Sequence, residues 1–166
     1  MTKELLVMRH AKSSWKEDSL PDHERPLNKR GRNDAPLMAG LLVEQDLQPD
    51  LILSSSAVRA RDTAELVARS LNHPEPGVEI VDDFYLATPD VYVEFLQRLS
   101  DDFFRPMVVG HNPGLEQLVN GLSNSWQTMP TAAVAHFVLE IVSWSDLDAD
   151  STPARLCHVF RPKELF

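Results

Sequence analysis

The feature that most constrains the fold is a short aliphatic run that occurs three times and is followed each time by polar residues. Residues 5–8 (LLVM) end at Arg9 and His10. The segments at residues 50–55 (DLILSS) and 105–112 (RPMVVGHN) have the same character. Short continuous aliphatic runs are typical of strands that are buried on both faces of a sheet. The sequence therefore predicts three central strands, each leading into a polar turn.

Segments whose apolar residues have helical spacing separate these runs. The predicted helices cover residues 28–45, 56–71, 89–100 and 113–122, and a further short strand covers residues 77–83. Strands that alternate with helices indicate an α/β layered fold with a mostly parallel central sheet. Residues 132–142 and 154–162 predict two closing strands joined by a short polar segment, and hence an antiparallel edge.

A long polar loop follows the first strand, and the helix after this loop contains a proline. Residues 11–27 are polar, contain Pro21 and Pro26, and read as a long loop of the kind that often carries function. Asn28 is a plausible cap for the helix that follows. Pro36 should either kink that helix or mark its true start, because proline cannot donate the backbone hydrogen bond that a helix interior needs.

Length and charge exclude several classes of protein. A chain of 166 residues fits a single domain spanning residues 1–166. The formal net charge of -9 argues against nucleic acid or an anionic membrane as a partner. No run approaches the ~20 apolar residues of a membrane span, and the first residues lack the pattern of a signal peptide. The single Cys157 excludes an internal disulfide, and we expect a cytoplasmic protein.

Cationic and imidazole side chains follow the three central strands. Arg9 and His10 end the first strand, Arg59 comes in the first turn of the helix after the second, and His111 ends the third. Ligands of open parallel sheets bind beyond the carboxyl ends of the strands, so we expect these four side chains to meet at one rim. Helix N-termini at that rim would add affinity for anions.

Two guanidinium groups and two imidazoles suit a phosphoryl group. Arginine presents a planar fork to phosphate oxygens, one neutral imidazole can attack phosphorus, and a second can donate to a non-bridging oxygen. The sequence has no Walker-type glycine loop, no magnesium-binding acid pattern and no spacing of a closed zinc site. We therefore expect side chains to hold the phosphate, with no cofactor and no metal.

Three motifs in this order resemble those of the histidine phosphatase superfamily: RH at 9–10, SSAVRARDTA at 55–64 and GHNP at 110–113. The pattern RHAKSSW followed by RPLNKRGRNDAP looks like the small SixA-type phosphohistidine phosphatase branch. The resemblance covers nearly the whole chain. It implies a three-layer α/β/α sandwich of the phosphoglycerate mutase-like kind.

The resemblance also implies roles for individual residues. His10 would be the nucleophile that forms a covalent phosphohistidine, and its second ring nitrogen should donate to a backbone carbonyl. Arg9, Arg59 and His111 would grip the phosphoryl oxygens and stabilise the charge of the transition state. Two residues of the long loop would bind substrate: Arg25 as a further arginine on the phosphate, and Asp22 as an acid lining the pocket.

A general acid is hard to identify. One branch of the superfamily has an aspartate directly after the second histidine, where this chain has Asn112, and Asp82 and Asp83 match the acid of the other branch poorly. The acid is therefore Asp82, Asp83 or none. A positioned acid contributes ~10²–10⁴-fold when an alkoxide leaves, whereas an imidazole with a conjugate-acid pKa of ~6.5 departs readily. A site without an acid favours phosphohistidine, phosphoramidates, acyl phosphates or anhydrides over phosphoserine or sugar monoesters.

Three functions are compatible with these residues. The first is a metal-independent phosphatase that acts through a phosphohistidine intermediate on His10, with a phosphohistidine-bearing protein as the partner. The second is a phosphomonoesterase or phosphoanhydride hydrolase of the same superfamily that acts on a small phosphorylated molecule. The third is a phosphoryl-binding module without turnover. The short chain leaves no room for large capping insertions, which favours an open groove and a protein substrate.

Overall fold

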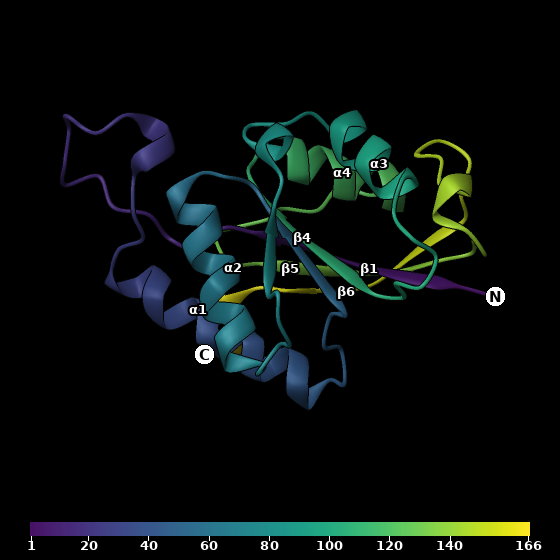
Figure 1. Cartoon of the computed structure of the whole chain (residues 1–166), viewed down its shortest axis with the longest axis horizontal. Coiled ribbons are helices and arrows are strands. Elements are labelled where there is room, and N and C mark those ends of the chain that lie inside the picture. The colour runs from purple at the N-terminus through teal and green to yellow at the C-terminus, as the bar shows by residue number, and fades with distance from the viewer.

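A six-stranded sheet in the order β3-β2-β4-β1-β5-β6 forms the centre of the protein (Figure 1). The computed structural model describes all residues, 1–166. The strands are β1 (Lys3–Arg9), β2 (Leu51–Ser54), β3 (Val78–Ile80), β4 (Pro106–Gly110), β5 (Val134–Leu139) and β6 (Ala154–Phe160). Strands β1 to β4 are mutually parallel, whereas β5 runs antiparallel to β1 and β6 antiparallel to β5. This arrangement confirms the predicted mostly parallel sheet with an antiparallel edge.

Helices cover both faces of the sheet and complete the three-layer α/β/α sandwich (Figure 1). The helices are α1 (Lys29–Glu44), α2 (Val58–Ser70), α3 (Pro89–Gln97), α4 (Gly114–Ser123) and α5 (Pro162–Leu165). Three single turns of 3-10 helix complete the list: η1 (Asp22–Glu24), η2 (Asp82–Phe84) and η3 (Trp144–Asp146). None of these helices is both long and apolar enough to cross a membrane.

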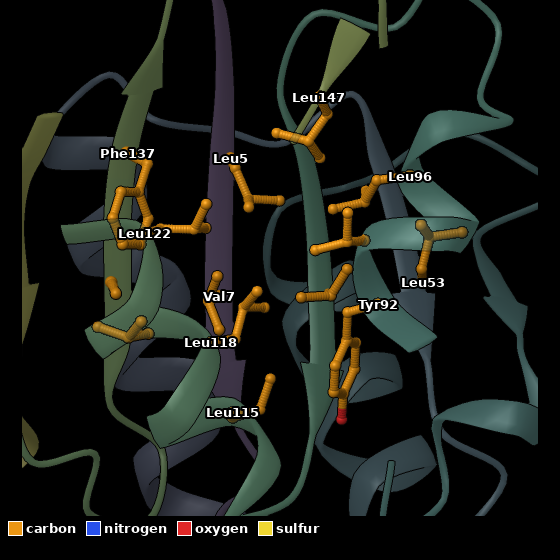
Figure 2. Close-up of a cluster of buried hydrophobic side chains, with 14 of the residues drawn as sticks. Leu5, Val7, Leu53, Tyr92, Leu96, Leu115, Leu118, Leu122, Phe137 and Leu147 are labelled. Atoms are coloured by element: carbon orange, nitrogen blue, oxygen red, sulfur yellow. The ribbon is translucent and has the colours of Figure 1, made fainter. Parts of the chain in front are cut away.

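The central strands are buried on both faces, which explains their continuous aliphatic sequences. Leu5 and Val7 of β1 pack in the core beneath α3 and α4 (Figure 2). Leu6 and Met8 of the same strand belong to the opposite core, which α1 and α2 cover. All four are fully buried. Because successive side chains of a strand point to opposite faces, a strand between two helical layers needs apolar residues at every position.

The register of the parallel strands brings their carboxyl ends together. Arg9 pairs with Gly110 across β1 and β4, and Ser54 pairs with Val109 across β2 and β4. Backbone hydrogen bonds continue one residue beyond the strands, where the N–H of His10 donates to the carbonyl of Gly110 at 3.0 Å. The three polar strand ends predicted from the sequence therefore lie at one edge of the sheet.

Helix α1 begins at Lys29 and runs through Pro36 to Glu44. The interpretation that Pro36 marks the start of the helix is therefore wrong. Asn28 is the cap, as predicted, because its side chain accepts a hydrogen bond from the backbone N–H of Gly31 at 2.9 Å. This cap starts the helix well before the proline.

Two connecting segments carry more structure than their polar sequences indicate. The 11–27 loop contains the turn η1 and an isolated bridge between Ser13 and Leu27. The segment between β5 and β6, predicted as a simple polar connection, contains η3 with Trp144 fully buried. The indole N–H of Trp144 donates to the carbonyl of Phe103 at 2.9 Å, so this segment packs onto the core.

Candidate active site

His10 lies directly after β1, almost fully buried, with one ring nitrogen hydrogen bonded and the other without a protein partner. Its Nδ1 is 2.7 Å from the carbonyl oxygen of Ala11. A carbonyl oxygen only accepts, so Nδ1 carries the proton and Nε2 keeps its lone pair. The backbone N–H of Ala11 donates in turn to Thr63 Oγ1 at 2.9 Å, which ties this turn to α2. The arrangement leaves Nε2 as the nucleophilic atom.

Electrostatics keep His10 neutral. Burial lowers the pKa of His10 to about 3, and the positive charges of Arg59, Arg9 and Arg25 act in the same direction. The hydrogen bond to Ala11 opposes these effects but does not cancel them. At neutral pH the imidazole is therefore unprotonated at Nε2, which is the state that can attack phosphorus.

His111 faces His10 from the end of β4. The two ring centroids are 5.2 Å apart, and the planes are inclined by 51°. Nε2 of His111 is 2.8 Å from the hydroxyl of Ser55, at the end of β2. Burial lowers the pKa of His111 to about 3, with further contributions from His10 and Arg59. Two neutral imidazoles thus stand side by side among arginines.

Three arginines surround the histidine pair, and each is oriented by oxygen acceptors. Arg9 Nη1 donates to the carbonyl of Met129 at 3.2 Å, while its Nε is buried without a partner. Arg59 uses both terminal nitrogens on Asp22, at 2.7 Å to the carbonyl and 2.9 Å to Oδ2. Arg25 donates from Nη1 to Asp22 Oδ1 at 3.0 Å. One carboxylate therefore holds two guanidinium groups in place.

Further contacts of Arg25 come from its own loop. Nη2 donates to the hydroxyl of Ser13, and Nε donates to the carbonyl of Ser14 at 3.2 Å. The Trp15 ring covers the guanidinium, with Cζ 3.2 Å from the ring centroid. The 11–27 loop thus folds back on Arg25, which explains why this arginine is buried despite its place in a polar segment.

These groups line a cavity of about 200 Å³. Its lining residues are Arg9, His10, Lys12, Ser13, Trp15, Arg25, Arg59, Leu86, His111, Asn112 and Thr131. A larger hollow of about 780 Å³ lies at the amino ends of β2 and β3, but it has more apolar than polar surface and only one arginine, Arg98. The concentration of cations at the smaller cavity makes it the candidate site for an anion.

Five of the six predicted site residues lie together in this cavity: Arg9, His10, Arg25, Arg59 and His111. Asp22 does not line it. Its half-exposed carboxylate instead binds two lining residues, Arg25 and Arg59, and accepts a hydrogen bond from Tyr85 at 2.6 Å. The structure thus brings the predicted residues together, and their catalytic roles stay predictions.

The acidic candidates are poorly placed to donate a proton. Asp82 and Asp83 are exposed on η2 and do not line the cavity. The hydrogen bond from Tyr85, followed by the two arginines, lowers the pKa of Asp22 to about 2. Asp22 is therefore ionised at neutral pH. No group of three or more His, Cys, Asp or Glu side chains is arranged to hold a metal ion.

Several residues that contact the two histidines or the turn after β1 could not be identified from the sequence. Ser55 and Thr63 belong to the 55–64 motif, but nothing in the pattern says that they contact His111 and Ala11. Tyr85 comes from the connection after η2, and its ring packs edge-on against His111 with centroids 5.5 Å apart. Only the packing of α2 and η2 against the strand ends reveals these contacts.

Comparison with known proteins agrees with the fold. Residues 5–84 match the model of the histidine phosphatase superfamily (branch 1). A protein of Arabidopsis thaliana is 34% identical over 161 residues, which cover 92% of this chain and 74% of the relative. The chain belongs to the histidine phosphatase superfamily, and it is a phosphatase.

Among its relatives, the chain resembles the SixA group. The phosphohistidine phosphatase SixA of Escherichia coli is 28% identical over 141 residues, covering 82% of this chain and 86% of the relative. The solved structure of a protein histidine phosphatase SixA complexed with tungstate superimposes with a TM-score of 0.82, at 23% identity, and covers 98% of this chain and 99% of that one. That superposition confirms the phosphoglycerate mutase-like fold.

Proposed function

We propose that the protein hydrolyses phosphoryl groups through a covalent intermediate on His10. The lone pair of Nε2 forms the new P–N bond while the bond from phosphorus to the leaving group breaks and its electrons depart with that group. Water then attacks the phosphorus and forms a new P–O bond, the P–N electrons return to Nε2, and the proton lost by the water passes to solvent. The observation that carries the proposal is the hydrogen bond from Nδ1 to the Ala11 carbonyl, because it leaves Nε2 unprotonated inside the cationic cavity.

The surrounding residues fit the charge that develops during this transfer. A transferring phosphoryl group spreads negative charge over three oxygens. Arg9, Arg25 and Arg59 provide three guanidinium groups around the cavity, and their orientations are already set by protein acceptors. Donors that are in place before the reaction stabilise its transition state most effectively. We assign the stabilisation to these side chains and propose that the reaction needs no metal.

The favoured substrate is a protein that carries phosphohistidine. With Asp22 ionised and Asp82 and Asp83 outside the cavity, no carboxylic acid protonates the leaving group. A good leaving group such as imidazole is then required. The likeness to the Escherichia coli phosphohistidine phosphatase and the exposed rim residues Trp15 and Leu86 support a protein substrate over an enclosed metabolite.

We further propose that residues 1–166 act as one domain. The proposed site takes residues from the first strand through α4, and the antiparallel β5 and β6 close the sheet beside β1.

The direct test is to trap the intermediate. Purified protein is mixed with ³²P-labelled phosphoramidate at neutral pH, quenched in alkali and digested. We expect label that is stable in base and labile in acid on the peptide containing His10, and none in His10→Ala. Turnover that is unchanged in His10→Ala would overturn the proposal.

A panel of donors then tests the substrate class. We expect a phosphohistidine peptide to be turned over at least about 100-fold faster than a matched phosphoserine peptide, because only the serine alkoxide needs a general acid. Comparable rates for the two peptides would contradict the proposed substrate preference without touching the mechanism. A sugar monoester serves as the small-molecule comparison.

A further inference from the structure

A neutral His111 has one N–H, and its neighbours determine which nitrogen carries it. Burial lowers the pKa of this ring to about 3, so it holds a single proton at neutral pH. Nε2 lies 2.8 Å from Ser55 Oγ, whereas Nδ1 is buried without a hydrogen-bond partner. The position of the proton therefore depends on the direction in which the Ser55 hydroxyl donates.

The hydrogen bonds around Ser55 determine that direction. Ser55 is fully buried, and its Oγ accepts a hydrogen bond from the backbone N–H of Ala57 at 3.2 Å. If Nε2 of His111 also donated to Oγ, the hydroxyl hydrogen of Ser55 would have no acceptor among its hydrogen-bonded neighbours. Leaving a buried donor unpaired costs roughly 1–3 kcal/mol. When the hydroxyl donates to Nε2, every group of Ser55 is paired and only the Nδ1–H of His111 lacks a partner, whereas the other tautomer leaves both the hydroxyl hydrogen and the Nδ1 lone pair unpaired.

We propose that Ser55 is a positioning residue whose hydroxyl donates to Nε2 of His111 and so keeps the proton on Nδ1, the atom that donates to the phosphoryl group. The inference rests on the proposed function, which supplies the phosphoryl group. A second cavity residue fits the same reading, because Nε of Arg9 is also a buried donor without a protein partner. A tautomer fixed in advance avoids reorganisation during the transfer.

The tautomer can be measured without any turnover. Protein with ¹⁵N-labelled histidine is studied by long-range ¹H–¹⁵N correlation at pH 7, and the His111 signals are assigned by their loss in His111→Asn. We expect Nδ1 to be protonated in the wild type and a mixture of tautomers in Ser55→Ala. Ser54→Ala is the matched control, since Ser54 is equally buried and its hydroxyl bonds the Ser55 carbonyl rather than a ring.

Kinetics provide the second readout. Ser55→Ala should lower kcat on an aryl phosphate by about 10–100-fold, approaching the loss of one transition-state donor, while Ser54→Ala stays within about twofold of the wild type. In a His111→Ala background the same Ser55→Ala change should have little further effect, because the two residues act through one donor. Ser55→Cys keeps a weaker donor of similar size, so its kcat should lie between the values of the wild type and Ser55→Ala. It replaces Ser55→Ala if that variant does not fold.

Two outcomes would overturn the inference: protonation of Nε2 in the wild type, or an equal kcat loss from Ser55→Ala with and without His111. A mere packing role for Ser55 predicts the second of these. Failure of the proposed function looks different, because turnover would then persist in His10→Ala whatever the tautomer of His111.

Discussion

At the scale of single residues, the site depends on one carboxylate that orders two arginines. Asp22 does not line the cavity, yet it holds Arg59 through two contacts and Arg25 through one. Its side chain is half exposed, so the ion pairs themselves add little stability. The ion pairs matter because they orient the two arginines. Misplacement of a phosphate-binding group lowers the rate even when its charge remains.

Asp22→Asn should therefore lower kcat more than it affects anion binding. We expect a fall in kcat of roughly tenfold from the loss of orientation, while inhibition by inorganic phosphate becomes no weaker because the net positive charge of the cavity rises. Steady-state kinetics with phosphate as inhibitor measure both effects. Asp83→Asn, an exposed neighbour outside the cavity, is the control; a comparable loss there would instead point to Asp83 as the acid.

Trp15 covers Arg25 from the solvent side. Trp15 is 69% exposed, and its ring lies 3.2 Å from the Cζ of Arg25. Trp15→Ala should raise KM for a phosphoryl donor by about two- to fivefold, the effect of losing a cation–π contact of ~0.5–1 kcal/mol. Trp126→Ala removes an exposed tryptophan that does not line the cavity and should leave KM unchanged. Equal KM values in all three proteins would show that the stacking is incidental.

At the scale of elements, the start of α1 is fitted against the loop that follows β1. A Cβ at Gly31 would overlap the carbonyl of Lys12, and that carbonyl also accepts the backbone N–H of Asn28 at 3.0 Å. The close approach of helix and loop places Lys12 and Ser13 at the cavity wall. Glycine is needed here for lack of space rather than for an unusual backbone conformation.

Gly31→Ala should consequently disturb both the helix and the site. We expect a loss of about 1–3 kcal/mol in the free energy of unfolding, typical of overpacking, together with reduced turnover. Chemical denaturation and kinetics measure the two effects. Gly40→Ala lies in the same helix with open space around it and should be neutral or slightly stabilising. An unchanged Gly31→Ala protein would show that the loop moves aside without cost.

At the scale of the whole molecule, the buried histidines make stability depend on pH. The folded-state pKa values of His10 and His111 are about 3, below the unfolded value of ~6.5. The unfolded chain therefore binds more protons between these limits, and stability is lost as the pH falls from about 6.5 toward 3. The two imidazoles that stay neutral for chemistry thus weaken the fold in acid.

The free energy of unfolding should fall as the pH is lowered from about 6.5 toward 3. The slope of this fall should be smaller in His10→Gln than in the wild type. A single histidine contributes at most about 1.4 kcal/mol per pH unit, so the variant should show a visibly flatter profile. Urea denaturation at several pH values measures it, and His158→Gln, an exposed histidine of β6 away from the cavity, serves as the comparison. Parallel profiles for the wild type and His10→Gln would mean that the imidazole is charged in the folded protein.

Much of the fold and the core of the site could be predicted from the sequence. The central strands carry continuous aliphatic runs because two helical layers bury them, and that pattern is legible without coordinates. Arg9, His10, Arg59 and His111 follow from their position at strand ends, since parallel strands share one carboxyl edge. The cap at Asn28 is a local interaction, so it too could be predicted from the sequence.

The contacts that complete the site depend on packing between distant segments. The ion pair of Asp22 with Arg59, the pairing of Ser55 with His111, and the ring of Tyr85 against His111 join residues far apart in the chain. Pro36 inside α1 and the buried Trp144 have the same origin, because tertiary context outweighs local preference there. Periodicity reports which face of an element is apolar; it carries no information on which polar groups meet across the molecule.

The order of residues along the chain by itself determined the layered α/β fold and the gathering of cations at one edge, because both follow from local hydrophobic pattern and strand direction. Only the tertiary structure decided the acceptors that hold Arg9 and Arg59, the contact between Ser55 and His111 and the absence of Asp82 and Asp83 from the cavity. These properties depend on distances of a few ångströms between segments that are remote in sequence.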